Sequence, residues 1–373
     1  FNNAPGVFMA SGALNTHRVV IRGVGSRTPY NSNRIRAYLD DIPLTSGDGI
    51  STLEDQDLLA IGSMEVLKGP SSALYGSGLG GIIRLNSPYP EYNGWGTSMQ
   101  AEAGSYGSQR YALTGSYKEG SVAFTGGYTR TSTDGYRENS KYLRNSAFLH
   151  GRVFGQKHQL SMTFSLVDLY AEIPSSLNEE DFLNNPDQAG GSWGSTGGYE
   201  EYITVLGGLK LESELVSRLH KKFILSASFS EPYERRPFNI LDEQSSNVGF
   251  RDFLDYRLNS LSLGIGLEYF HESFNWRTYE TLSESQGALL SHHKEQRNYM
   301  NVFSYGQWRP APGVLIDAGL NLNILSYTLS TEYRMDSTDQ SGSYTYQPVL
   351  SPRIGISIRH KQEIWTYASA GHG

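Results

Sequence analysis

The feature that most constrains the fold of this chain is a strict alternation of apolar and small polar residues. In segment 159–166, apolar side chains occupy every second position and Ser or Thr lies between them. Segments 111–117, 261–269 and 314–324 repeat the pattern, mostly with Ser, Thr, Gly or Asn at the polar positions. Alternation over this length predicts β-strands with two unlike faces, one apolar and one polar.

A soluble β-sandwich would also alternate, so further features must decide between it and a membrane barrel. The segments reach or exceed the roughly 10 residues with which a tilted strand crosses a membrane. The polar face is small rather than charged, and the 25 Tyr, 15 Phe and 5 Trp recur near segment ends. Only 18% of the residues are charged, against about 25% in soluble domains. We therefore predict an antiparallel transmembrane β-barrel over residues 91–373.

The connections between the alternating segments differ in length in a way that supports this prediction. Short turns are expected at 118–121, 154–158 and 309–314. Long polar loops are expected at 168–199, 232–252, 282–296 and 332–347. Short turns at one end and long loops at the other are typical of outer-membrane barrels. In the first long loop, Ser176 and Glu179 fit a capping box for a short helix.

The first 90 residues follow a different pattern and predict a small α/β domain. Short strands are expected at 18–25, 34–44, 62–69 and 80–87. Between the second and third of these, Ser51 and Glu54 fit a capping box, followed by an apolar stripe, and predict a helix over 51–61. A single helical turn is expected after Pro70, which suits a helix start, and it ends at Gly76.

Several kinds of chemistry are disfavoured by the residues present. The chain has no cysteine and therefore no thiolate. Lys68 precedes Gly69 instead of following a glycine-rich loop, so the stretch does not match a phosphate-binding loop. The net charge of −7 argues against nucleic acid as a partner. His292 and His293 are adjacent, so on a strand they would point to opposite faces and chelate poorly; a solvated loop is the favoured interpretation, and no metal or cofactor is expected.

Three segments of the N-terminal domain resemble the plug domain of TonB-dependent outer-membrane transporters. They are "RVVIRGVGSR", "RIRAYLDDIPL" and "MEVLKGPSSALYGSGLGGIIRLNSP", and they match in order and spacing. The sequence departs from the family at Asp41, where a glycine is usual, and at Arg84 and Leu85. The resemblance assigns a structural motif to Arg22, Gly23, Glu65, Lys68, Gly69, Pro70, Tyr75, Gly76 and Arg84. Because buried charges must be paired, we expect the charged members to find partners in the plug or on the barrel wall, unless they face water.

The resemblance implies an active transporter of the outer membrane rather than an enzyme. Its expected partners are the TonB energy-transducing complex, outer-membrane lipid and a small-molecule ligand. A ferric siderophore is the favoured ligand, with cobalamin, haem or an oligosaccharide as alternatives. A passive porin or a barrel enzyme would be different classes of function. Both are disfavoured because neither needs a plug, and the nine histidines show no catalytic pattern.

The polar stretch between the first two plug strands is the expected ligand-binding apex. Its candidate residues are Arg27, Tyr30, Asn31 and Arg34. Guanidinium groups offer charged, fork-like donors and tyrosine offers stacking, as an anionic or catecholate-like chelate would require. An ordinary turn around Pro29 is the alternative. Segment 43–51 is a second candidate surface, and Trp193 and Tyr199 are candidate loop contacts.

The resemblance also implies that the chain is part of a longer protein. The N-terminal box that binds TonB in the family is missing, and the chain starts inside the plug. Roughly thirteen alternating segments are present, whereas plugged transporters have 22 strands. We therefore expect a plug that lacks its N-terminus and a barrel that lacks its C-terminal strands.

Overall fold

The computed structural model describes residues 2–27, 32–69, 72–76, 78–283, 285–361 and 364–372. The chain is mainly β, with 68% of residues in strands and 5% in helices, which confirms the predicted fold class. The helices are short: α1 (Ser72–Tyr75), α2 (Glu179–Asn184), α3 (Gly191–Thr196) and a 3-10 turn at Leu58–Ala60. No helix among the described residues has the length and apolar character needed to cross a membrane.

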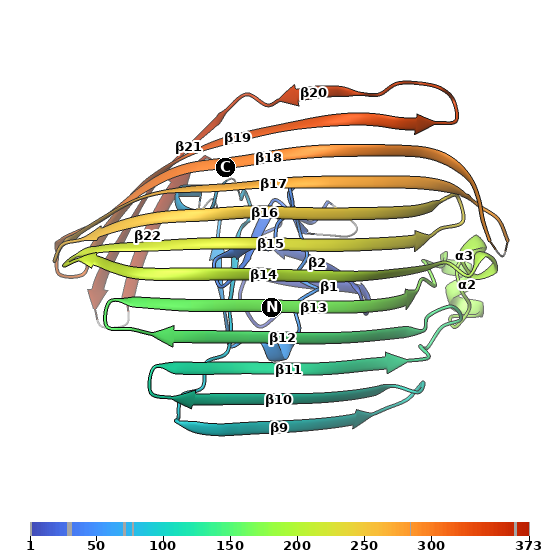
Figure 1. Ribbon diagram of the computed structural model, residues 1–373, viewed down its shortest axis with the longest axis horizontal. Coiled ribbons are helices and arrows are strands. Elements are labelled where there is room, and N and C mark those ends of the chain that lie inside the picture. The colour runs from blue at the N-terminus through green and yellow to red at the C-terminus, as the bar shows by residue number, and fades with distance from the viewer. Residues whose placement is uncertain are drawn as a thin grey trace.

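A 14-stranded antiparallel sheet makes up most of the chain, and in it consecutive strands pair with one another, except that β21 pairs with β19 rather than with β20. The sheet curves around the N-terminal region, which lies behind it in Figure 1. The strands β9 and β22 are its two edges, and β20 lies beside β19 off the main path. The strands are β9 (Gly94–Ala103), β10 (Gln109–Glu119), β11 (Val122–Thr133), β12 (Tyr142–Phe154), β13 (His158–Glu172), β14 (Tyr199–Val216), β15 (Leu219–Arg235), β16 (Ile240–Arg257), β17 (Leu261–Thr281), β18 (Gln286–Ala311), β19 (Val314–Arg334), β20 (Gly342–Thr345), β21 (Val349–Lys361) and β22 (Ile364–Gly371).

The two faces of this sheet are inverted relative to a sheet in a soluble protein. On β13, Ser161, Thr163 and Ser165 are buried, whereas Leu160 is 45% exposed and Phe164 is 37% exposed. The buried polar face is the one turned toward the N-terminal region, since Thr163 donates a hydrogen bond to Asp40 there. An apolar face turned outward and a polar face turned inward are what a lipid-facing barrel wall requires.

Aromatic pairs border the exposed apolar face at both ends of the strands. Trp95 and Tyr117 lie near the short turns, with ring centroids 4.4 Å apart. Tyr170 and Tyr199 lie at the opposite end, with ring centroids 5.2 Å apart. Aromatic girdles of this kind mark the two membrane–water interfaces of barrels.

Two of the expected long loops prove to be mostly strand, so those boundaries are wrong. Residues 232–252 contain the end of β15 and the start of β16, and residues 286–296 belong to β18. The strands run to 26 residues, well beyond a membrane crossing. Polar residues on both faces masked the strand signal here, but ladder hydrogen bonds do not require apolar side chains. The helix α2 does form in segment 168–199, with Asn178 rather than Ser176 as its N-cap.

The N-terminal region consists of a hairpin and a small mixed sheet. β1 (Val7–Ala13) pairs with β2 (Thr16–Ile21), and β3 (Ser32–Asn33) pairs with β6 (Ile50–Ser51). The mixed sheet has the order β5-β4-β8-β7, in which β4 and β8 are parallel. Its strands are β4 (Ile35–Leu39), β5 (Ile42–Pro43), β7 (Ser63–Lys68) and β8 (Gly81–Asn86).

The core of this region is shared with the wall of the large sheet. Ile35 and Ile83 are fully buried in one apolar cluster, and Leu206 of β14 and Ile224 of β15 belong to the same cluster. Burial of apolar area is the main favourable contribution to folding. The N-terminal region therefore depends on the wall for part of its stability.

The helix expected over 51–61 is not formed, and only the 3-10 turn capped by Asp57 is present. Ser51 lies in β6, where its hydroxyl donates to the carbonyl oxygen of Ile35 at 2.7 Å. A side chain that satisfies a neighbouring strand in this way is not available to cap a helix. The expected turn after residue 70 is present as α1.

The inverted faces predict opposite responses to the same substitution at adjacent positions of β10. Leu113 is 48% exposed on the apolar face, whereas Thr114 follows it on the inward face. Leu113→Lys should lower the free energy of unfolding in lipid by about 2–4 kcal/mol, because a charge then enters the hydrocarbon. Thr114→Lys is the matched control and should cost much less. Equal losses in urea titrations of the two variants in vesicles would contradict the assignment of the faces.

Candidate functional site

The inner face of the large sheet and the N-terminal region meet through a buried polar network, here called the central network. Its centre is Glu268 of β17, which is 1% exposed. The guanidinium nitrogens of Arg36 on β4 and Arg251 on β16 lie 3.7 and 3.9 Å from its carboxylate oxygens. Tyr38 donates to the same carboxylate at 3.2 Å, and Asn301 of β18 donates to it at 3.1 Å. The carboxylate of Glu268 therefore compensates the charge of Arg36 from the N-terminal region and the charge of Arg251 from the large sheet.

Ring contacts and backbone contacts complete the central network. Arg36 lies over the ring of Tyr299 at 4.4 Å, and Arg251 lies over the ring of Tyr75 at 4.6 Å. Arg251 also donates to the carbonyl oxygen of Leu74 in α1. Burial raises the pKa of Tyr38 well above its usual value, and the charge of Glu268 adds to this effect, so the phenol remains a donor. Removing one partner from such a buried pair typically costs about 3–5 kcal/mol.

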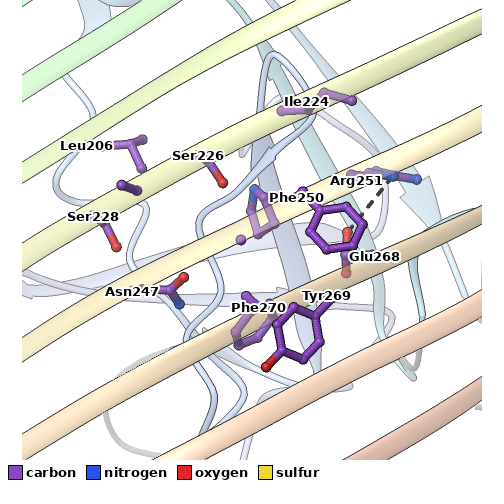
Figure 2. Close-up of a pocket in the computed structure, with 13 residues that line it drawn as sticks. Leu206, Ile224, Ser226, Ser228, Asn247, Phe250, Arg251, Glu268, Tyr269 and Phe270 are labelled. Atoms are coloured by element: carbon purple, nitrogen blue, oxygen red, sulfur yellow. Dashed lines mark ion pairs between the residues drawn. The ribbon is translucent and has the colours of Figure 1, made fainter.

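The geometry around this network leaves no room for a ligand. Figure 2 shows Arg251 and Glu268 side by side on adjacent strands, at the edge of a cavity of about 20 Å³. That volume is close to a single water molecule. A second cavity of about 390 Å³ lies at the short-turn end of the sheet, between the turns after β12, β14 and β16. The central network is thus a contact between two parts of the chain, and the larger cavity lies elsewhere.

The charged members of the predicted plug motif have different surroundings. Arg84 lies between Glu65 at 2.8 Å and Asp41 at 3.4 Å, as expected for a paired charge. Lys68 donates to the carbonyl oxygen of Pro5. Arg22 is exposed, and among the described residues no carboxylate lies within ion-pair distance of it. The roles of these residues in transport remain predictions.

The glycines of the motif are required by the backbone and by close packing. Gly23, Gly69 and Gly76 all have positive φ, at 84°, 88° and 75°. A Cβ on Gly76 would lie 2.5 Å from Asn301 Nδ2 and 2.6 Å from the hydroxyl of Tyr299. Glycine avoids both the strain and the clash. Tyr75, the preceding residue, is buried, and Pro70 lies outside the described residues.

The predicted ligand residues are only partly described. Arg27 and Arg34 are both exposed, whereas Tyr30 and Asn31 lie outside the described residues. Arg34 has a positive φ of 64°, and its carbonyl oxygen accepts from the N–H of Gly80 at 2.9 Å. Both arginine side chains are therefore accessible, and their role in ligand binding remains a prediction.

The second candidate surface, residues 43–51, contacts the wall near the long-loop end. The N–H of Gly47 donates to Glu272 at 2.8 Å. Arg297 of β18 lies 3.7 Å from Asp48 and 3.3 Å from Glu272. This surface is thus held by wall charges rather than being free for a ligand along its whole length.

A third contact brings acidic residues of the N-terminal region against the wall. Tyr202 donates to Asp55 at 2.7 Å, and Arg144 donates to the backbone carbonyl oxygen of Glu54 at 2.6 Å. The pKa of Glu54 is raised to about 8, mainly by burial, and the neighbouring charges of Asp55 and Glu200 contribute in the same direction. Glu54 is therefore held protonated at neutral pH.

The two adjacent histidines lie on a strand, so the expectation of a solvated loop is wrong. His293 is buried on the inward face of β18 and stacks on Trp276, with centroids 5.0 Å apart. His292 is on the other face and lies 2.7 Å from Asn275. The described residues contain no group of three or more metal-ligating side chains.

The wall residues that form these contacts were missed by sequence reasoning. Arg251 lies in an expected loop and Glu268 in an expected strand, neither with a predicted role, and Glu272 and Arg297 lie outside the expected segments. A usable signal was present at Glu268, because a large acidic side chain occupies a face otherwise made of Ser and Gly. Such a side chain on an inward face needs a partner inside the lumen.

The raised pKa of Glu54 predicts a pH dependence of stability. Between pH 4.5 and about 8 the unfolded chain is ionised at this position while the folded chain keeps its proton, so stability falls as pH rises through that window. Glu54→Gln should remove this loss. We expect a gain of at least about 2 kcal/mol near pH 9 and little change near pH 4, measured by protease sensitivity of the N-terminal region in urea. Glu91→Gln, at an exposed glutamate, is the control; an equal gain of Glu54→Gln at both pH values would refute the assignment.

Comparisons with known proteins agree with this architecture. Residues 1–82 match the TonB-dependent Receptor Plug Domain family. A stretch of 98 residues is 33% identical to the ferrioxamine receptor of Yersinia enterocolitica, covering 26% of this chain and 13% of that receptor.

The fold is also that of solved receptors. The ferric yersiniabactin uptake receptor FyuA of Yersinia pestis matches with a TM-score of 0.81 and 16% identity, over 98% of this chain and 60% of that one. The ferric citrate transporter FecA in its unliganded form matches with a TM-score of 0.82 and 15% identity, over 99% of this chain and 59% of that one. The chain thus spans about 60% of the length of these receptors. Residues 1–82 are therefore a plug domain of the TonB-dependent receptor family, and the chain as a whole has the fold of these receptors.

Proposed function

We propose that this chain forms the plug and part of the barrel of an active importer of a ferric chelate, integral to the bacterial outer membrane. Residues 1–90 act as the plug and residues 91–373 contribute barrel wall. The observation that carries the proposal is the central network, in which plug and wall charges compensate one another inside the sheet. A solute cannot pass while these contacts hold, and breaking buried ion pairs requires work. Energy supplied by TonB provides that work.

The same observation favours an importer over a passive porin. A porin needs an open aqueous lumen. Here Arg36 and Tyr38 of the plug contact Glu268 of the wall, and the shared apolar core extends from Ile35 to Leu206 and Ile224. The relatives are receptors and transporters, which also favours a non-enzymatic function.

A ferric siderophore is the proposed ligand class. The similarity to receptors of ferrioxamine and ferric yersiniabactin supports this choice. We propose that Arg27, Tyr30, Asn31 and Arg34 contact the chelate at the plug apex. The exposure of Arg27 and Arg34 is compatible with this role, because guanidinium groups bind anionic oxygen through paired donors.

The test is uptake by cells that express the whole receptor, with and without a working TonB system. Ferric ferrioxamine, ferric citrate, haem, cobalamin and a maltodextrin are the probes. We expect uptake of a ferric chelate only with TonB, and a loss of about tenfold in apparent affinity when Arg27 and Tyr30 are both replaced by alanine, as two charged or stacking contacts are removed. Arg309→Ala, at an exposed arginine at the short-turn end, is the control.

Uptake of a different probe would retain the importer and reject the ferric chelate. Leakage of every solute without TonB would reject the importer. An effect of Arg309→Ala equal to that of the apex variant would reject the apex as the ligand site.

A further inference from the structure

Asp41 is the second residue of the two-residue turn that joins β4 to β5, and its backbone is unusual for an aspartate. Asp40 and Asp41 have φ values of 51° and 72°. Turns in which both central residues have positive φ strongly favour glycine at the second position, because glycine has no Cβ to clash. An aspartate at this position is strained, so its side chain needs a compensating role.

The strain at Asp41 is compensated by cationic side chains around its carboxylate. Two of these side chains come from the wall. Lys222 of β15 lies 2.8 Å away and Lys210 of β14 lies 3.6 Å away. Arg84 of the plug lies 3.4 Å away on another side. Burial alone would raise the pKa of Asp41, but the lysines outweigh it and hold the pKa well below its usual range. The carboxylate is therefore charged and tied to two adjacent barrel strands.

These wall lysines lie next to the larger cavity. Lys222 and Glu212 line the cavity of about 390 Å³ at the short-turn end. Glu212 lies 3.5 Å from Lys222 and 3.9 Å from Lys210, so the cavity wall and the Asp41 contact form one network. The cavity is within the range of about 300–1,000 Å³ that holds a small ligand. The β4–β5 turn borders this cavity through the contact of Asp41 with Lys222, which lines it.

This contact is easier to break than the central network. The lysine side chains at positions 210 and 222 are 14% and 29% exposed, whereas Arg36 and Glu268 are 7% and 2% exposed. Partly exposed ions regain water when they separate, and buried ones do not. The lysine partners of Asp41 therefore regain water more readily than Arg36 or Glu268 when the ion pairs separate, although Asp41 itself is only 6% exposed.

We propose that Asp41, Lys210 and Lys222 form a gate, and that the ligand leaves through the cavity at the short-turn end when the β4–β5 turn separates from β14 and β15. This proposal rests on the proposed importer function. In it the central network stays closed while the gate opens, so export of the ligand to the inner side does not require release of the whole plug.

The first test joins the gate covalently in the whole receptor. Asp41→Cys with Lys222→Cys, bridged by a short reducible bis-methanethiosulfonate, ties the turn to the wall; this chain supplies no competing cysteine. With radioiron-labelled ferrioxamine as the probe, we expect unchanged surface binding, at least about tenfold slower TonB-dependent uptake, and recovery after reduction. Asn15→Cys with Glu200→Cys, a plug–wall contact remote from the cavity, is the matched control and should still transport.

The outcomes separate the gate from the importer function. Normal uptake with the gate joined, or loss of uptake with either bridge, would overturn the gate. If the unbridged receptor neither binds nor takes up ferrioxamine, ferrioxamine is rejected as the ligand and the gate is not yet decided. The second test then decides the gate, because it needs no ligand.

The second test uses passive leak. Asp41→Gly suits the left-handed backbone, so the variant should fold, yet it loses the contact with both lysines. In cells without TonB we expect at least about a fourfold increase in sensitivity to a large hydrophilic antibiotic, and a smaller increase for Asp41→Asn. Glu65→Gln removes a plug carboxylate that pairs with Arg84 and not with the wall, and should not leak. Wild-type resistance in Asp41→Gly would overturn the gate.

Discussion

The interaction on which the rest of the structure depends is the compensation of plug charges by wall charges inside the sheet. Glu268 is almost fully buried and is acceptable there only because Arg36 and Arg251 approach it from opposite partners. Arg36 of the plug and Glu268 of the wall each find a partner in the other half of the chain, so each half stabilises the other. The shared apolar cluster around Ile35 and Leu206 has the same consequence. The plug and the curved sheet therefore share both an apolar cluster and a polar network.

The inverted sheet explains why such charges can be placed on the wall at all. An inward face of Ser, Thr and Gly is small enough to let the plug approach closely, as Gly76 does against Asn301. Larger polar side chains on this face meet either a plug group, as Glu268 meets Arg36, or another wall residue, as Asp255 meets Tyr305. The outward face obeys a separate constraint, since Leu160 and Phe164 remain exposed on it. Alternation along each strand allows both constraints to be met by neighbouring residues.

The sequence correctly predicts those structural features that depend on local periodicity and on turn residues. The faces of β13 follow from the alternation of Phe164 with Thr163, and α1 follows from the turn signals around Gly76. The helix expected at 51–61 failed because Ser51 bonds to a distant strand, which no local pattern shows. The pairing of Arg36 with Glu268 joins residues 232 positions apart, so it depends on the register of the whole sheet. Arg84 was predicted to be paired, but its partners Asp41 and Glu65 become visible only in the structure.

The plug–wall contacts differ in how much water reaches them, and this difference orders them by ease of release. The pair between Arg36 and Glu268 borders a cavity for only about one water molecule, so separating it leaves two poorly hydrated charges in the interior. The contact of Asp41 with Lys222 borders a cavity, and each ion can be hydrated as it leaves. A force applied to the plug would therefore first break the ion pair whose separation costs the least free energy. The strained turn at Asp41 contributes in the same direction, because its left-handed backbone is held by the lysines and relaxes once they are gone.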